Sequence, residues 1–369
     1  MTEPAFGTTA RLVVDLSAIA ANYRRLGAEL GAGVICAGVL KANGYGLGAN
    51  RIGRALWAEG CRVFFVAHFE EGRTLREALP GAEIFVLNGA APGDETEFAA
   101  HQLAPTLNSL ADITAWAHLC AELGPRPAAL HIDTGMSRLG LAPEELDILA
   151  AEPTRLGAID LRLVMSHLAC GEERSHPMNA RQLAAFEQAR ARLPATRASL
   201  ANSAGIFLGP RYHFDLVRPG LALYGGNPFP DQPNPMRATV RIEARLLQVR
   251  NVDQGGTVGY GAARILERRT KIATIAIGYA DGYRRGLSDR DRVLVAGQSV
   301  PVIGRVSMDL VTLDVTGIAD EALVPGSWVE IVGPSRTVEA FAAQSGTIDY
   351  EILTTLGARL QRHYVTESS

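Results

Sequence analysis

Lys41 ends the apolar run VICAGVL, and a glycine-rich loop, ANGYGLG, follows it. A lysine in this place either escapes to solvent at a strand end or presents its amine to a pocket. In a partly apolar pocket the amine has a lowered pKa and can form a Schiff base with an aldehyde. Lys41 is therefore the first candidate for chemistry.

Other reactive or phosphate-binding residue types also follow apolar runs later in the chain. A lone histidine or arginine in such a place is more often structural, but several of them on one rim would favour a site. The residues concerned are Asp133, Arg138, Ser166, His167, Asn202, Ser203, Arg218, Pro219 and Gly220.

The elements that must position these residues are eight short apolar runs with helical patterns between most of them. Alternation of this kind indicates parallel β/α units, and eight units match a (β/α)8 barrel, predicted for residues 12–235. A doubly wound open sheet is the structural alternative. In a barrel the active site lies at the carboxyl ends of the strands, where Lys41 and the later residues would meet. The runs are 34–41, 63–67, 84–88, 103–108, 128–133, 161–168, 197–203 and 216–225.

An aldehyde cofactor that a lysine holds is pyridoxal phosphate, which also needs a phosphate cup. Ser203, the N–H groups around Gly220 and Leu221, and the Tyr45 hydroxyl could supply one. Arg218 could face the pyridine nitrogen and keep it unprotonated, because a guanidinium does not give up its proton. An unprotonated pyridine is a weaker electron sink, which disfavours side reactions.

A proline-rich segment, GGNPFPDQPNPM at 225–236, marks a domain boundary. Residues 236–369 are predicted to form a mostly-β domain, joined by an N-terminal strand at 8–14. Within this domain only EILTTLGARLQRHY, at 351–364, has a helical pattern.

Composition excludes several classes of protein. The net charge of -3 argues against nucleic acid as a partner, and no apolar run is long enough to span a bilayer. The N-terminus lacks the pattern of a signal peptide, so we expect a cytoplasmic protein. The four cysteines are far apart and are expected to be reduced thiols.

Seven motifs together resemble the alanine racemase family of barrel-class (fold-type III) pyridoxal-phosphate enzymes, an isomerase family. They are VLKANGYGLG, HIDTGMSRLG, MSHLA, LANSAG, VRPGLALYG, VGYGA and GRVSMD, and the resemblance runs from about residue 10 to residue 351. It implies interconversion of L-alanine and D-alanine, with D-alanine supplied for peptidoglycan. Lys41 would hold the cofactor and take the α-proton of the D-isomer, and Tyr260 would serve the L-isomer. It also implies a head-to-tail homodimer in which each active site receives its tyrosine from the other subunit.

The resemblance assigns further roles. Arg138 would hold the cofactor's phenolic oxygen and the substrate carboxylate, which the Met308 N–H would also bind. His167 and Arg218 would flank the cofactor ring, with Asn202 close by. Its phosphate would be bound by Tyr45, Ser203, Gly220, Leu221 and Tyr350. The corridor by which substrate enters would be lined by Tyr279, Arg285, Arg305 and Asp309.

One departure from the family pattern concerns Arg138. Many members carry a lysine at the position of His131, where its carbamate holds this arginine. Here a bound anion or a direct contact is expected to orient Arg138 instead. No metal site is predicted.

Several alternatives stay open from the residues. The nearest is a racemase of serine, lysine or several amino acids. A barrel-type decarboxylase of basic amino acids would need a cysteine in the second domain, where none lies beyond residue 170. A non-catalytic protein that only carries pyridoxal phosphate would need no more than the barrel. The simplest alternative is a barrel protein that binds no cofactor.

Overall fold

The computed structural model describes residues 8–366, and the chain divides into two compact units. One unit is Ile19–Arg237. The other combines the segment that ends at Ala18 with the segment that begins at Ala238. Along residues 8–366, no helix has both the length and the apolar character needed to cross a membrane.

The Ile19–Arg237 unit is a closed parallel barrel. Seven strands pair in chain order from β3 to β9, and β10 pairs with β2. Strands β2 and β3 are two halves of one strand, because the N–H groups of Ala37 and Val39 both donate to the chain at β10, to Val217 O (3.0 Å) and Pro219 O (3.1 Å). The Arg218 N–H donates to Ala201 O at 2.9 Å and joins β10 to the β9 side. The ring of eight strands confirms the (β/α)8 prediction and excludes the open sheet.

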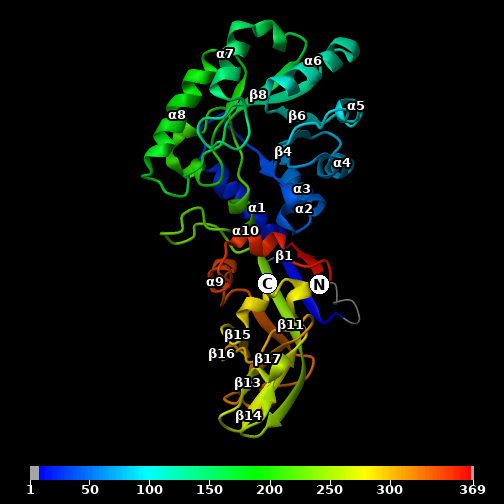
Figure 1. Cartoon of the computed structure of the whole chain (residues 1–369), viewed down its shortest axis with the longest axis vertical. Coiled ribbons are helices and arrows are strands. Elements are labelled where there is room, and N and C mark those ends of the chain that lie inside the picture. Colours follow the sequence, from blue (N-terminus) through cyan, green and yellow to red (C-terminus); the bar gives the residue numbers. More distant parts are fainter. Residues whose placement is uncertain (1–7, 367–369) are drawn as a thin grey trace. The chain divides into compact units, whose positions relative to one another are not determined.

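The strands are β2 (Ile35–Cys36), β3 (Gly38–Val39), β4 (Val63–Val66), β5 (Glu83–Val86), β6 (Ala104–Leu107), β7 (Pro127–His131), β8 (Asp160–Met165), β9 (Arg197–Ser199) and β10 (Leu216–Val217). Helices α3 to α8 lie outside them (Figure 1). These helices are α3 (Ala49–Ala58), α4 (Phe69–Ala78), α5 (Glu95–Ala100), α6 (Leu110–Leu123), α7 (Pro143–Ala151) and α8 (Pro177–Arg190). Helix α1 (Leu16–Gly27) precedes the first barrel strand in the chain.

Burial on both faces explains why these strands are continuous apolar runs. All four residues of β4 are buried, and the Phe65 ring stacks on Phe85 of β5 with centroids 5.1 Å apart. Each such side chain contributes roughly 1.5–3 kcal/mol by leaving water. This core fixes the strand ends, which carry the candidate residues.

The second unit is built on one long strand, β11 (Val240–Val252). Its first half pairs with β1 (Ala10–Asp15) and β18 (Trp328–Val332), and its second half pairs with β14 (Thr270–Ile275). Register shifts between the partners bend it, as bulges do. The other elements are β12 (Thr257–Val258), β13 (Arg264–Ile265), β15 (Arg292–Val295), β16 (Gln298–Pro301), β17 (Val311–Asp314), β19 (Gln361–Val365) and helices α9 (Val338–Gln344) and α10 (Asp349–Thr354).

The helix predicted over 351–364 is wrong beyond its first turn. Helix α10 ends at Thr354, and β19 then pairs in parallel with β1. Gly357 follows the helix in close contact with another segment: its N–H donates to Asp281 O at 3.0 Å, and a Cβ there would lie 2.3 Å from Ala280 O. Edge pairing with β1 therefore overrides the local helical periodicity. Helix α9 begins at Val338, after the N-cap residue Thr337, whose side chain accepts the Ala340 N–H. This helix was not predicted.

Candidate active site

Lys41 follows β3 and opens a left-handed turn, part of the short element α2 (Lys41–Tyr45). Ala42, Asn43 and Tyr45 have φ values of 54°, 53° and 54°, and Gly44 and Gly46 continue the same hand. The Gly44 N–H donates to Leu40 O at 2.7 Å. Left-handed backbone costs roughly 1–2 kcal/mol for each residue that is not glycine. Strain of this kind is typical of functional sites.

The Lys41 amine lies in a partly buried position among charged groups. Burial lowers its pKa, the Arg138 guanidinium lowers it further, and the Glu71 carboxylate opposes the change. More of the amine is therefore neutral near pH 7 than for a lysine in water. A neutral amine is the form that attacks an aldehyde or accepts a proton.

A cradle for a small anion forms where Tyr45 meets the chain after β10. The Ser203 hydroxyl is buried and accepts the N–H groups of Gly220 (3.0 Å) and Ala222 (3.2 Å). A Cβ on Gly220 would lie 2.2 Å from the Tyr45 hydroxyl oxygen. Only glycine thus allows Tyr45 to approach the backbone here. The structure brings together three of the predicted phosphate ligands, and Leu221 lies between Gly220 and Ala222.

Arg218 joins the ends of three strands. Its guanidinium donates to the Ser199 hydroxyl at the end of β9 and to Ser166 O after β8, and it lies 3.4 Å from His167 Nδ1. The side chain is buried and forms no ion pair with a carboxylate of residues 8–366, and burial lowers its pKa to about 9. It stays cationic at pH 7, so it can act as a fixed donor.

His167 is neutral at pH 7. Burial and the nearby cations Arg218, Arg138 and Lys41 lower its pKa well below the usual range. Its flat, uncharged ring suits contact with another aromatic ring. Asn202 is engaged locally, since its Oδ1 accepts the Gly205 N–H at 2.9 Å and its Nδ2 donates to Leu168 O at 3.4 Å.

Arg138 lies in the loop that follows β7, and it is exposed. The loop itself is ordered by Asp133, whose Oδ1 accepts the N–H groups of Gly135 (2.8 Å) and Met136 (2.9 Å). A fixed loop with an exposed guanidinium suits the binding of a carboxylate.

His131 is a buried, neutral partner of Asn108. Its Nδ1 lies 2.8 Å from Asn108 Oδ1, and the Asn108 amide nitrogen donates to Leu87 O and Thr106 O. His131 Nδ1 therefore carries the proton and donates. Burial, then Arg218 and Arg138, lower its pKa to about 4. His131 thus pairs with Asn108. A bound anion or a direct contact that orients Arg138 stays a prediction.

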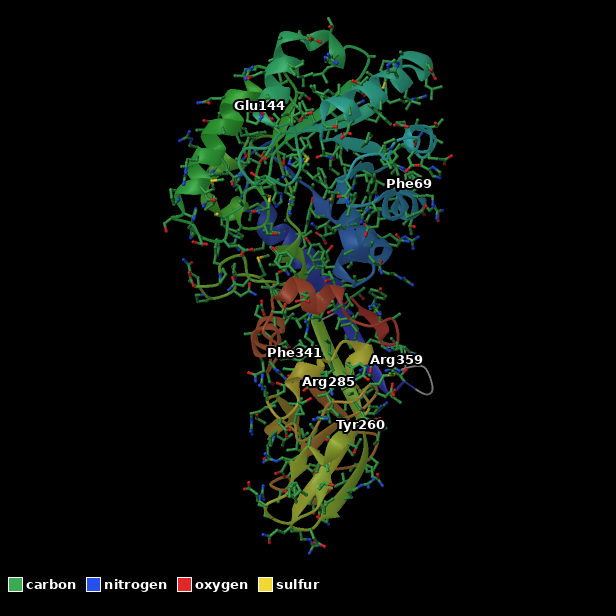
Figure 2. The ribbon with its side chains drawn as sticks, in the orientation of Figure 1. Phe69, Glu144, Tyr260, Arg285, Phe341 and Arg359 are labelled. Carbon is green, nitrogen blue, oxygen red and sulfur yellow. The ribbon has the colours of Figure 1, made fainter. Side chains whose placement is uncertain are left out.

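The remaining predicted residues belong to the second unit. Tyr260 opens a 3-10 turn and is 70% exposed, and a Cβ on Gly261 would lie 3.0 Å from the Arg305 guanidinium. The side chains of Tyr260 and Arg285 are marked in Figure 2. Arg285 begins another 3-10 turn, and Tyr350 lies in α10.

Tyr279, Met308 and Asp309 form one cluster on this unit. The Tyr279 N–H donates to Ser307 O at 3.1 Å, and both Tyr279 and Met308 are exposed. Asp309 pairs with Arg359 at 2.7 Å. Ordered loops thus present an aromatic ring, a backbone segment and a carboxylate to the surface.

Both units match models of one protein family. Residues 14–228 match the model described as "Alanine racemase, N-terminal domain", and residues 239–364 match "Alanine racemase, C-terminal domain". The chain belongs to the alanine racemase family.

Individual alanine racemases match along nearly their whole length. The alanine racemase of Rhodospirillum rubrum is 51% identical over 96% of this chain and 96% of its own. The catabolic alanine racemase of Mesorhizobium japonicum is 50% identical over 96% of this chain and 93% of its own. The crystal structure of the Bartonella henselae alanine racemase, with covalently bound pyridoxal phosphate, has a TM-score of 0.93 at 44% identity and covers 98% of this chain and 100% of its own.

Two residues of this alanine racemase fold were not assigned from the sequence. The Tyr224 ring stacks on Tyr45 at 4.4 Å, and its hydroxyl donates to Val39 O at 2.8 Å. Glu71 accepts the Asn43 N–H at 3.2 Å, in the turn after Lys41. Tyr224 ends the motif VRPGLALY, and Glu71 lies three residues after His68, where a capping carboxylate is expected. These two positions in the sequence could have indicated Tyr224 and Glu71.

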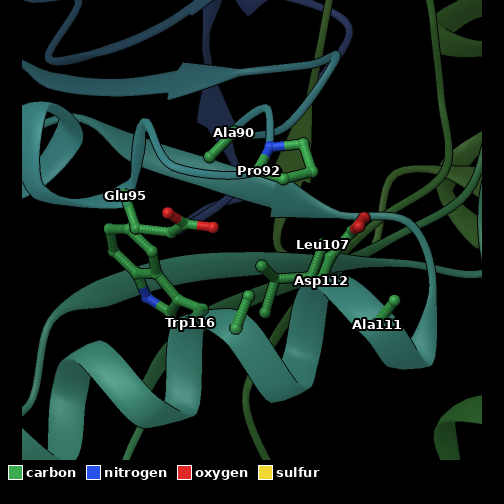
Figure 3. Close-up of a pocket in the computed structure, with 8 residues that line it drawn as sticks. Ala90, Pro92, Glu95, Leu107, Ala111, Asp112 and Trp116 are labelled. Carbon is green, nitrogen blue, oxygen red and sulfur yellow. The ribbon is translucent and has the colours of Figure 1, made fainter.

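A small cavity of about 80 Å³ lies elsewhere in the barrel unit, between the loop after β5 and helices α5 and α6 (Figure 3). Glu95, Leu107, Asp112 and Trp116 are among its lining residues, and no predicted site residue is. It is therefore separate from the candidate active site.

Proposed function

We propose that this chain is an alanine racemase, which interconverts L-alanine and D-alanine with pyridoxal phosphate as cofactor. The observation that carries the proposal is the position of Lys41. Its amine is partly buried, its pKa is lowered, and it opens the turn after barrel strand β3, in which Tyr45 approaches Gly220 at the cradle for a phosphate. The full-length similarity to alanine racemases supports the same reaction.

The residues present fit this cofactor. Lys41 supplies an amine for the aldehyde, and the hydroxyls of Tyr45 and Ser203 and the Leu221 N–H would supply donors for the phosphate. The Gly220 N–H donates to Ser203 in this structure and would also face the phosphate. Because Gly220 has no Cβ, the Tyr45 hydroxyl can approach the backbone of the cradle. Arg218 and His167 supply a fixed cation and a neutral ring for the pyridine. When it is bound, the cofactor withdraws electrons from the α-carbon of the amino acid and makes its proton acidic.

The reaction needs a proton removed from one face of that carbon and returned to the other. We assign the face of the D-isomer to Lys41 and the face of the L-isomer to Tyr260 of the partner subunit. Arg138 and the Met308 N–H would hold the substrate carboxylate. Tyr350 would add to the phosphate ligands, and Tyr279, Arg285, Arg305 and Asp309 would line the path of the substrate.

We propose that the protein acts as a cytoplasmic homodimer with shared active sites. The exposure of Tyr260 (70%) and Met308 (51%) supports this, because a partner subunit would cover them. Analytical ultracentrifugation of the purified protein would report the assembly.

Circular dichroism of L-alanine incubated with the protein and pyridoxal phosphate tests the proposed reaction. We expect the ellipticity to decay to zero, and the D-alanine signal to decay to the same value. A stable signal for both isomers, with the cofactor bound, would contradict the proposal. Serine, lysine and arginine measured alongside should decay much more slowly.

Replacing Gly220 by alanine is expected to disturb the phosphate cradle. The new methyl would press on the Tyr45 hydroxyl, and overpacking of this kind costs about 1–3 kcal/mol. We expect the Kd for pyridoxal phosphate, measured by titration, to rise about tenfold, since 1.4 kcal/mol is tenfold. Gly31→Ala is the control, because a Cβ there meets nothing within 4 Å. Equal affinity in the two variants would contradict the cradle.

A further inference from the structure

The Glu71 carboxylate joins two segments of the barrel. Its Oε2 accepts the N–H groups of Ala67 (2.8 Å) and His68 (3.3 Å), where β4 leads into helix α4. Its Oε1 accepts the N–H of Asn43 at 3.2 Å, in the left-handed turn that follows Lys41. One side chain thus ties the turn to the neighbouring β/α unit.

The left-handed turn needs support of this kind. Its hydrogen bonds from Gly44 to Leu40 O and from Gly46 to Ala42 O are both local. The Asn43 side chain adds another local bond, since its Oδ1 accepts the Ala49 N–H at 3.0 Å. Strained backbone persists only where the surrounding structure holds it. The bond from Asn43 to Glu71 spans 28 residues and supports the turn from outside, in addition to the stacking of Tyr45 on Tyr224.

The charge of Glu71 also reaches the amine. Lys41 is influenced by Arg138, which lowers its pKa, and by Glu71, which raises it. His167 is affected by Lys41 in turn, but it is neutral at pH 7 and adds no charge. Glu71 is therefore the anion that offsets burial and Arg138 at Lys41.

We propose that Glu71 is a positioning residue for Lys41, which anchors the left-handed turn at Asn43 and keeps a negative charge at the turn that carries the amine. The inference rests on the proposed function, in which Lys41 holds the aldehyde and moves a proton. Without the carboxylate, the turn would open more often, and the protonated amine would lose a favourable interaction.

The chain makes this testable because it contains only two lysines, Lys41 and Lys271. Full-length protein freed of cofactor is labelled with acetic anhydride across a pH series, and mass spectrometry compares Lys41 with Lys271 as the internal reference. Lys271 lies in the other unit and pairs with Asp320. In Glu71→Gln, we expect the midpoint of Lys41 labelling to move to lower pH while that of Lys271 stays unchanged.

Glu70→Gln is the matched control. It removes the same charge from the adjacent residue of α4, where Glu70 is exposed and pairs only with Arg73 among the ion pairs of the described chain. Hydrogen exchange of the peptide that contains Asn43 is the second readout. We expect exchange about tenfold faster in Glu71→Gln than in Glu70→Gln, because the amide carries no charge and its single oxygen cannot accept both from Asn43 and from the N–H groups of Ala67 and His68.

Glu71→Asp separates the two parts of the role and serves if the glutamine variant fails to fold. It keeps the charge but shortens the reach, so exchange should rise while the Lys41 midpoint stays closer to that of the wild type. In the holoenzyme, the low-pH limb of kcat for D-alanine should move to lower pH in Glu71→Gln, because kcat reports the complex in which the substrate has released the Lys41 amine.

Two results would overturn the proposal. One is identical labelling and exchange in Glu71→Gln and Glu70→Gln. The other is faster exchange without a shift of the midpoint, which would make Glu71 a structural residue alone. Labelling and exchange use neither cofactor nor substrate, so a failure of the racemase assignment would show separately in the alanine assay.

Discussion

Lys41→Ala is expected to lose racemase activity by at least about 10⁴-fold, because the variant lacks both the group that holds the cofactor and one of the two bases. The loss should be equal in the two directions of reaction. Pyridoxal phosphate should still bind, because the phosphate cradle at Ser203 and Gly220 is unchanged. It should bind more weakly, because the covalent attachment to Lys41 is lost. Polarimetry with L-alanine and D-alanine measures the activity, and the visible spectrum reports the attachment.

The sequence supplies an unusually clean control for this variant. Lys271 is the one other lysine, and it pairs with Asp320 in the second unit. Lys271→Arg should keep full activity. Borohydride reduction of the wild-type holoenzyme, followed by peptide mapping, should place the cofactor on Lys41. Cofactor found on Lys271, or activity retained without Lys41, would refute the assignment.

Tyr260→Phe is expected to lower the rate of L-alanine racemisation by about 10²–10⁴-fold, the usual contribution of a general base. Phenylalanine keeps the ring, and Tyr260 is 70% exposed in the chain, so folding should be unaffected. Because Lys41 remains, the variant should still exchange the α-hydrogen of D-alanine with deuterated water and return it on the same face. Proton NMR of each isomer in deuterated water follows this exchange.

A comparison of the exchange rates of the two isomers decides the role of Tyr260. If Tyr260 serves the L-isomer, exchange of L-alanine falls much further than exchange of D-alanine. Tyr212→Phe, a change in a 3-10 turn of the barrel unit, should leave both rates unchanged. Equal losses for the two isomers would indicate that Tyr260 helps to bind substrate and does not act as the second base.

The barrel was predictable from the sequence because its signal is local. Each strand of a parallel sheet is buried on both faces, so its sequence is a short run of apolar residues. The rule that sites lie at the carboxyl ends of strands then placed the residues after those runs on one rim. The contacts of Arg218 with Ser199, Ser166 and His167 confirm that three strand ends meet there.

Contacts between distant residues could not be predicted in the same way. The turn over 355–360 and strand β19 depend on pairing with β1, more than 300 residues earlier, which helical periodicity does not report. His131 pairs with Asn108, whose amide is oriented by two backbone carbonyls, and the spacing of these residues in the sequence does not indicate this contact.

The sequence by itself determined the eight strands, the reactive residue types at their ends and, through its motifs, the resemblance to one enzyme family. Only the tertiary structure decided how Lys41 is held, namely by a left-handed turn bonded to Glu71 and by neighbours that lower its pKa. The physical reason is range. Strand and helix signals follow from neighbouring residues, whereas burial, charge and hydrogen bonding at the amine depend on side chains that only folding brings together.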